Sequence, residues 1–177
     1  LFSKGAAVFV DSGTMGNLLS IKALTQPGDE VIMEADSHTY HYESGGYAAL
    51  AGVSFRFVKA ERGIIQPEQI PPAVRPPDLH HARSSLVVLE NTHNRGGGSV
   101  YPVETVEAIA EVCREHDLRL HMDGARIFDA CVAAGCEPAD YARHVDSVTF
   151  CLSKSLGCPA GSMIAGEGEF IEQVRWL

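Results

Sequence analysis

The sequence predicts an α/β fold, a three-layer sandwich in which a mostly parallel sheet lies between two layers of helices. Two observations predict it. Short apolar runs alternate with amphipathic stretches along the 177 residues, and strands that alternate with helices form parallel sheets covered on both faces. Apolar residues make up 45% and charged residues 21% of the chain, a composition typical of a globular protein with a sizeable core.

The first half of the chain contains four predicted strands and two predicted helices. Residues 14–25 place apolar side chains three and four positions apart, as on one face of a helix. Residues 38–50 are predicted as a second helix, although Gly45 and Gly46 lower its helix propensity. The apolar runs predicted as strands are residues 6–10, 30–34, 54–59 and 86–90.

The second half continues the alternation after a proline-rich segment. Residues 61–84 hold five of the nine prolines, so we expect a loop there with one short helix near residues 67–74. Pro102 suits the first turn of a helix that runs to about residue 116, and residues 126–135 are expected to be partly helical. The remaining predicted strands are residues 118–122, 147–152 and 162–165.

Both ends of the sequence resemble interrupted helices. Residues 1–5 finish on a glycine, as the last turn of a helix often does. Residues 169–177 keep a helical spacing up to the last residue. Because there is no linker and no internal repeat, we expect residues 1–177 to be one large domain that is truncated at both ends.

Charge and cysteine content limit the function classes. The formal net charge is -9 and no basic run stands out, which argues against a nucleic-acid partner. No apolar stretch is long enough to span a membrane, and the first residues do not form a signal peptide. The five cysteines are odd in number, irregularly spaced and form no CxxC pair, which indicates reduced thiols in a cytoplasmic protein. We expect no membrane partner.

A lysine and an aspartate each close an apolar run that is predicted as a strand. Lys154 follows one run and Asp123 follows an earlier one, and ligands of parallel sheets bind at the carboxyl ends of strands. A lysine there can form a Schiff base and a carboxylate can hold a pyridine nitrogen protonated, as pyridoxal phosphate (PLP) requires. The alternatives are a lysine that extends to solvent and a local ion pair between Asp123 and Arg126.

The segment Ser12-Gly13-Thr14 lies between a predicted strand and a predicted helix. Backbone N–H groups at a helix N-terminus favour an anion such as a phosphate, and Ser153, next to Lys154, could donate a further hydrogen bond. The alternative is helix capping by Ser12 or Thr14 alone.

Two histidines follow predicted strands. His38 could stack on a flat ring or transfer protons, and the alternative is a surface or capping histidine. His41 makes a metal pair with it conceivable, but no third ligand has suitable spacing, so we predict no metal site. His93 precedes a run of three glycines; it could reach a substrate, or the loop could be only a flexible turn.

Five motifs, taken together, resemble one enzyme group. They cover nearly the whole chain and occur in the order of that group. The chain closely resembles low-specificity L-threonine aldolases, which belong to the β-eliminating lyase family of fold-type I PLP enzymes. The motifs are Ser12-Gly-Thr-Met-Gly-Asn17, Glu34-Ala-Asp-Ser-His38, Glu90-Asn-Thr-His-Asn94, His121-Met-Asp-Gly-Ala-Arg-Ile-Phe128 and Cys151-Leu-Ser-Lys154.

The resemblance implies a cofactor-binding role for several residues. Lys154 matches the Schiff-base lysine, and Asp123 matches the partner of the pyridine nitrogen. Gly13, Thr14 and Ser153 match phosphate contacts. The chain would then be the PLP-binding large domain of a PLP-dependent transferase-like fold, without the small C-terminal domain of the family.

The resemblance also implies a substrate and a reaction. His38 matches a histidine stacked on the cofactor, Arg126 matches the arginine that holds the substrate carboxylate near the cofactor, and His93 matches a histidine near the substrate hydroxyl. We therefore expect a PLP-dependent carbon–carbon lyase that cleaves L-threonine or L-allo-threonine to glycine and acetaldehyde, with His38 or His93 as the base. Family members imply a homodimer or homotetramer.

Two alternatives stay open from the sequence. One is another PLP-dependent β-eliminating lyase. The other is an inactive truncated product that acts at most as an assembly partner.

Overall fold

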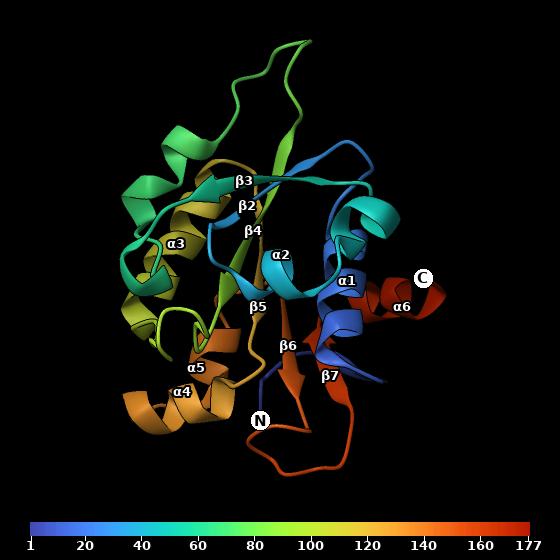
Figure 1. The fold of residues 1–177 in the computed structure, drawn as a ribbon, viewed down its shortest axis with the longest axis vertical. Coiled ribbons are helices and arrows are strands. Elements are labelled where there is room, and N and C mark those ends of the chain that lie inside the picture. Colours follow the sequence, from blue (N-terminus) through green and yellow to red (C-terminus); the bar gives the residue numbers. More distant parts are fainter.

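The computed structural model describes residues 1–177, which form one seven-stranded sheet in the order β1-β7-β6-β5-β4-β2-β3 (Figure 1). Strands β6, β5, β4, β2 and β3 are parallel to one another, and β7 is antiparallel to both of its neighbours. The predicted mostly parallel sheet is therefore confirmed. The strands are β1 (Ala6–Val10), β2 (Glu30–Glu34), β3 (Ser54–Val58), β4 (Ser84–Glu90), β5 (Arg119–Asp123), β6 (Ser147–Cys151) and β7 (Ser162–Gly166).

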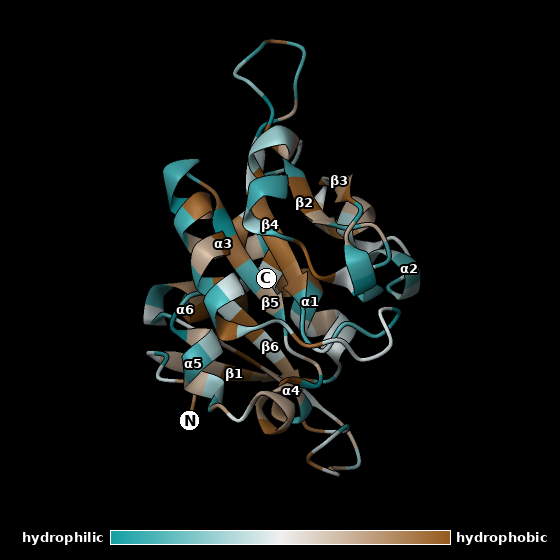
Figure 2. Ribbon diagram, turned by 90° about the vertical axis from the view of Figure 1, so that its left-hand side faces the viewer, coloured by the Kyte–Doolittle hydropathy of each residue, from teal (hydrophilic) through white to brown (hydrophobic).

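Helices cover both faces of this sheet, as the alternation of elements predicts (Figure 2). None of them is long and apolar enough to cross a membrane. The α-helices are α1 (Gly13–Leu24), α2 (His38–Tyr42), α3 (Val103–Glu115), α4 (Ile127–Ala134), α5 (Pro138–Ala142) and α6 (Gly168–Trp176), and the shorter helical turns are η1 (Tyr47–Ala51), η2 (Glu61–Gly63), η3 (Pro67–Gln69) and η4 (Pro71–Ala73).

The two layers form because successive side chains of a strand point to opposite faces. In β2, Ile32 packs into the core cluster that contains α3, α4 and α5, whereas Val31 and Met33 pack into the cluster that contains Ile21 of α1. Each of these four side chains is fully buried. The central strands β2, β4 and β6 are buried on both faces because both faces are covered, which is why they appear in the sequence as largely apolar runs.

The predicted helix over residues 38–50 is wrong in one respect. The α-helix ends at Tyr42, and a π-helical turn begins at Tyr47. Between them Ser44 and Gly45 have positive φ angles of 54° and 69°, which no right-handed helix contains. The break turns the backbone at Glu43, whose side chain is buried.

Three further segments differ from the predictions. Residues 1–4 are irregular and not helical, because Phe2 is held in the core by stacking on Phe150 at a centroid distance of 4.5 Å. Residues 67–74, expected to form one short helix, form two 3-10 turns, and a third 3-10 turn lies earlier in the proline-rich segment. Helix α5 was not predicted; it is only five residues long, and a reciprocal cap between Glu137 and Asp140 starts it.

The parallel strands place their carboxyl ends along one edge of the sheet. Glu34, Glu90 and Asp123 are the last residues of β2, β4 and β5, and Cys151 is the last residue of β6. Polar side chains of the following turns therefore meet at this edge, which we call the carboxyl edge.

Candidate active site

The carboxyl edge brings together the lysine and the aspartate that the sequence singles out. Asp123 ends β5, and it pairs in register with Thr149 of the neighbouring strand β6. Lys154 lies in the turn that follows β6 and is partly buried. The charges of Asp123 and Lys154 both act on the pKa of His38, at the start of α2, so the three groups share one site.

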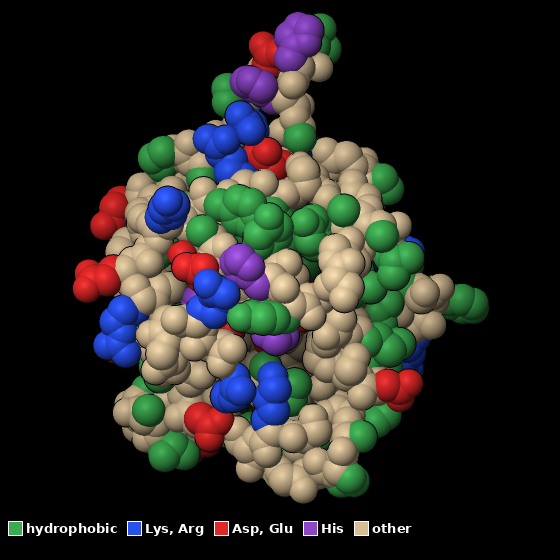
Figure 3. All heavy atoms as spheres, viewed as in Figure 1, with side chains coloured by type: hydrophobic (Ala, Val, Ile, Leu, Met, Phe, Trp, Pro, Cys, Tyr) green, Lys and Arg blue, Asp and Glu red, His purple; other side chains and the backbone are tan.

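Basic and histidine side chains gather over this edge. Figure 3 shows them near the centre of the visible face, over α2 and the ends of β5 and β6. Burial lowers the pKa of His38 below its ordinary value; the charge of Asp123 opposes that shift, while Lys154 and Arg126 lower the pKa further. His38 is therefore neutral at pH 7 and able to accept a proton.

Buried carboxylates are the second feature of the site. Glu34, Glu43, Glu90 and Asp123 are each between 2% and 6% exposed. Burial, followed by the charge of Asp123, raises the pKa of Glu43 to about 8 and that of Glu90 to about 7. Carboxyl groups buried this closely together each require a proton, a cation or a hydrogen-bond donor.

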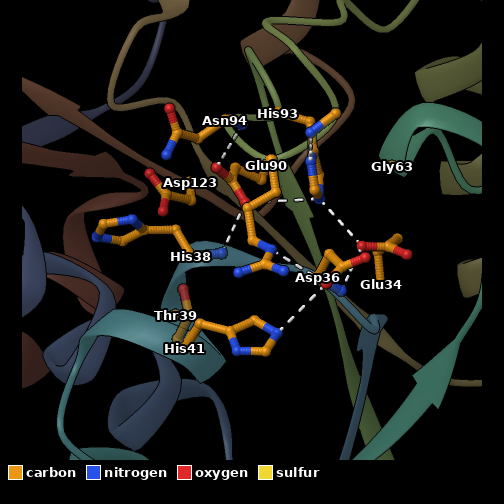
Figure 4. Close-up of polar contacts among 12 residues, drawn as sticks. Glu34, Asp36, His38, Thr39, His41, Gly63, Glu90, His93, Asn94 and Asp123 are labelled. Carbon is orange, nitrogen blue, oxygen red and sulfur yellow. Dashed lines mark hydrogen bonds and ion pairs between the residues drawn. The ribbon is translucent and has the colours of Figure 1, made fainter.

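Glu90 ties two loops of the site together (Figure 4). One carboxylate oxygen accepts a hydrogen bond from the backbone N–H of His38 at 2.8 Å, and the other accepts one from the N–H of Asn94 at 2.9 Å. The Asn94 amide oxygen in turn accepts a hydrogen bond from Arg126 at 3.4 Å. Through these contacts the positions of His38 and Arg126 depend on the same carboxylate.

His93 lies in the same cluster but is enclosed by protein, with 1% of its surface exposed. Its Nδ1 accepts a hydrogen bond from the N–H of Gly96 at 3.0 Å, so the ring proton is on Nε2. That nitrogen lies 3.1 Å from a Glu34 oxygen and 3.6 Å from a Glu90 oxygen and forms a well-aligned hydrogen bond with neither. Burial lowers the pKa of His93, although Glu34 opposes the shift.

Gly63 makes room for the His93 ring. Its φ is +80°, and a Cβ added there would lie 2.3 Å from His93 Cγ. Only glycine fits both the backbone conformation and the contact.

Replacing Gly63 with alanine should therefore lower the free energy of unfolding by about 2–4 kcal/mol, since it adds a steric clash to left-handed backbone strain. Gly97→Ala is the matched control, because Gly97 has a φ of +82° and nothing within 4 Å of an added Cβ. Urea unfolding of both variants measures the difference. Equal losses would show that the close approach to His93 contributes nothing.

The turn before α1 caps the helix and leaves backbone N–H groups of the first helical turn without a partner in the helix. The Ser12 side chain accepts a hydrogen bond from the N–H of Met15 at 3.1 Å, so Ser12 caps the helix. The N–H groups of Gly13 and Thr14 belong to the first helical turn and have no partner within the helix. A Cβ on Gly13 would lie 3.0 Å from Cys151 Sγ at the end of β6, so this turn lies next to the segment that carries Ser153 and Lys154.

Sequence reasoning missed Asn17, Glu43, Glu90 and Gly63 as site residues. Glu90 could have been found, because it ends a predicted strand just as Asp123 does. Asn17 and Glu43 fall inside predicted helices, where spacing does not show which polar side chain points inward.

The residues of the carboxyl edge fit pyridoxal phosphate. The fit rests on three observations of different kinds: a lysine in the turn after β6 whose charge acts on the buried carboxyl groups of Glu43 and Glu90, backbone N–H groups in the first turn of a 12-residue helix that have no partner within the helix, and a buried carboxyl group at the end of β5 that can accept the N–H of a protonated ring nitrogen. Lys154 would hold the aldehyde carbon, Asp123 the ring nitrogen, and Gly13, Thr14 and Ser153 the phosphate.

Comparison with known proteins shows to which family the sequence is similar. The sequence model of the family described as beta-eliminating lyase matches residues 1–177. The chain is 47% identical over 98% of its length to a protein of Arabidopsis thaliana named "Probable low-specificity L-threonine aldolase 2", and covers 50% of it. It is 40% identical over 99% of its length to the low specificity L-threonine aldolase of Escherichia coli K12, and covers 53% of it.

A solved structure has the same fold. The threonine aldolase of Leishmania major superposes with a TM-score of 0.86 at 24% identity, over 97% of this chain and 51% of that one. The chain therefore spans about half the length of the relatives it matches.

Proposed function

Because the chain belongs to the beta-eliminating lyase family, we propose that the protein is a PLP-dependent aldolase that cleaves L-threonine, L-allo-threonine and related β-hydroxy-α-amino acids to glycine and an aldehyde. The family is PLP-dependent. The observation that carries the proposal is the meeting of Lys154, Asp123 and His38 at one edge of the sheet, where their charges interact.

The chain's own residues would hold the cofactor in a fixed orientation. The Lys154 amine would attach it covalently, and the Asp123 carboxylate would accept the hydrogen bond of its ring N–H. Gly13, Thr14 and Ser153 would donate hydrogen bonds to its phosphate. Pyridoxal phosphate, when bound, supplies an acceptor for the electrons of the bond that is cleaved.

Arg126 and His38 would act on the substrate. Arg126 would bind the substrate carboxylate and so turn the Cα–Cβ bond toward the reactive orientation. His38, neutral at pH 7, would take the proton of the β-hydroxyl. His93 is the second candidate for this proton transfer, but in that role its ring would have to turn away from Glu34 and Glu90.

Product analysis tests the proposed reaction. With added PLP and L-threonine, the purified protein should form glycine and acetaldehyde in equal amounts. The sister activity of the family is β-elimination, which yields ammonia and a 2-oxo acid, such as pyruvate from L-serine. Formation of ammonia without glycine would favour that second activity and reject the aldolase.

The pH dependence of turnover should report the titration of His38. Its pKa lies below the ordinary value of 6.5, so the proton-accepting form predominates at neutral pH and is lost as the pH falls through that lower pKa. We expect kcat/KM to decrease on the acid side with an apparent pKa below 6.5. His38→Asn should remove this limb and lower kcat by roughly 10²–10⁴-fold. An unchanged acid limb in the variant would exclude His38 as the base.

We also propose a cytoplasmic protein that assembles as a homodimer or homotetramer. All five cysteines are free thiols in the structure, which suits a reducing compartment. Light scattering after size-exclusion chromatography measures the mass in solution, and a monomer would reject the proposed assembly.

A further inference from the structure

Asn17 of α1 lies at the centre of the buried polar network below the carboxyl edge. It is 2% exposed, and its amide nitrogen donates one hydrogen bond to Asp123 Oδ2 and one to Glu43 Oε1, both at 2.8 Å. Asp123 Oδ1 accepts a separate hydrogen bond from the N–H of Ala125 at 3.1 Å. One side chain therefore links the carboxylate at the end of β5 to a second carboxylate that follows α2.

The orientation of the Asn17 amide is fixed by groups on its other side. Its oxygen accepts a hydrogen bond from the Thr149 hydroxyl at 2.7 Å and lies 3.3 Å from His121 Nε2. Burial lowers the pKa of His121 to about 4, so the ring is neutral, with Nδ1 accepting from the Ser147 hydroxyl at 2.7 Å and Nε2–H donating to Asn17. A flipped amide would turn its oxygen toward two carboxylates.

Asn17 joins Asp123 to a carboxyl group whose pKa is strongly raised. Burial, followed by the charge of Asp123, raises the pKa of Glu43 to about 8, so Glu43 keeps its proton at neutral pH. Two buried carboxyl groups without a donor between them share a proton. With the Asn17 amide between them, Asp123 is oriented by donors on both of its oxygens and does not share the proton of Glu43.

We propose that Asn17 is a positioning residue for the cofactor's ring nitrogen: it orients Asp123 to accept the ring N–H and separates Asp123 from Glu43. This inference rests on the PLP binding proposed above. It assigns a role to a residue that touches neither the substrate nor the cofactor. Its effect should therefore depend on the presence of the ring nitrogen.

Binding of two ligands to the cofactor-free protein tests this dependence. One ligand is PLP, and the other is 1-deazapyridoxal phosphate, in which a C–H group replaces the ring nitrogen. In Asn17→Ala we expect the Kd of PLP to rise roughly tenfold or more, because a charge-assisted hydrogen bond is weakened. The Kd of the deaza analogue should change less than about twofold, since it has no ring N–H for Asp123 to accept.

Two further variants supply a second test and a control. Thr149→Val removes only the hydroxyl that donates to the Asn17 oxygen. It should raise the Kd of PLP more than that of the deaza analogue, but by less than Asn17→Ala does. It therefore tests the inference even if Asn17→Ala folds poorly. Ser20→Ala is the control, because Ser20 lies on the same helix, is fully buried and has no hydrogen-bond partner. It should leave both Kd values unchanged.

The outcomes separate this inference from the proposed function. Equal weakening of both ligands by Asn17→Ala and Thr149→Val would mean that Asn17 is merely structural, and unchanged PLP binding would show that Asp123 does not need it; either result overturns the inference. If the unaltered protein binds PLP no better than the control Lys154→Ala protein, the proposed function itself fails and the inference fails with it.

Discussion

Replacing Lys154 with alanine should abolish covalent cofactor binding and lower turnover by more than roughly a thousandfold. Lys154 is the lysine whose charge acts on His38, Glu43 and Glu90, and in the proposed function its amine attaches the cofactor. The visible absorbance of the protein-bound cofactor and the rate of glycine formation measure the two effects.

Lys59→Ala is the matched control for this variant. Lys59 is exposed at the end of β3, and only its backbone carbonyl takes part in a hydrogen bond. The control should keep both absorbance and turnover. Covalently bound cofactor in Lys154→Ala would mean that another lysine holds it.

Replacing Asp123 with asparagine should lower kcat by about a hundred- to a thousandfold while some cofactor stays bound through Lys154. The substitution keeps the shape of the side chain but removes the negative charge that stabilises a protonated ring nitrogen. It should also lower the pKa of Glu43, because the charge of Asp123 is, after burial, the largest cause that raises that pKa.

Steady-state kinetics with L-threonine measure the loss of kcat, and Asp117→Asn serves as the control because Asp117 is exposed and has no side-chain hydrogen bond. Unchanged turnover in Asp123→Asn would exclude an electrostatic role for this carboxylate.

The sequence alone predicts the sheet and the residues at the ends of its strands. Covered parallel strands are continuous apolar runs, so a charged residue that closes such a run is conspicuous. Asp123 and Lys154 stand out for this reason, and β1 and β2 have the predicted bounds. The order of the strands in the sheet then brings these residues together.

The sequence does not predict features that depend on side-chain direction or on a single backbone turn. Asn17 looks like any polar residue in a helix until the fold places it between Asp123 and Glu43. Glu43 falls within a predicted long helix, whereas in the structure it is buried and directly precedes the break at Ser44 and Gly45. The enclosure of His93 depends on Gly63, a residue 30 positions away in a segment with no apolar period.

Chemical trapping tests the central claim, that the carboxyl edge is a PLP site centred on Lys154. The purified protein is incubated with PLP, reduced with borohydride to fix the cofactor on the lysine that holds it, digested and mapped by mass spectrometry. The chain has lysines only at positions 4, 22, 59 and 154, so the other three serve as internal controls. Stoichiometric modification of Lys154 alone is the predicted result, and modification of another lysine, or of none, would contradict it.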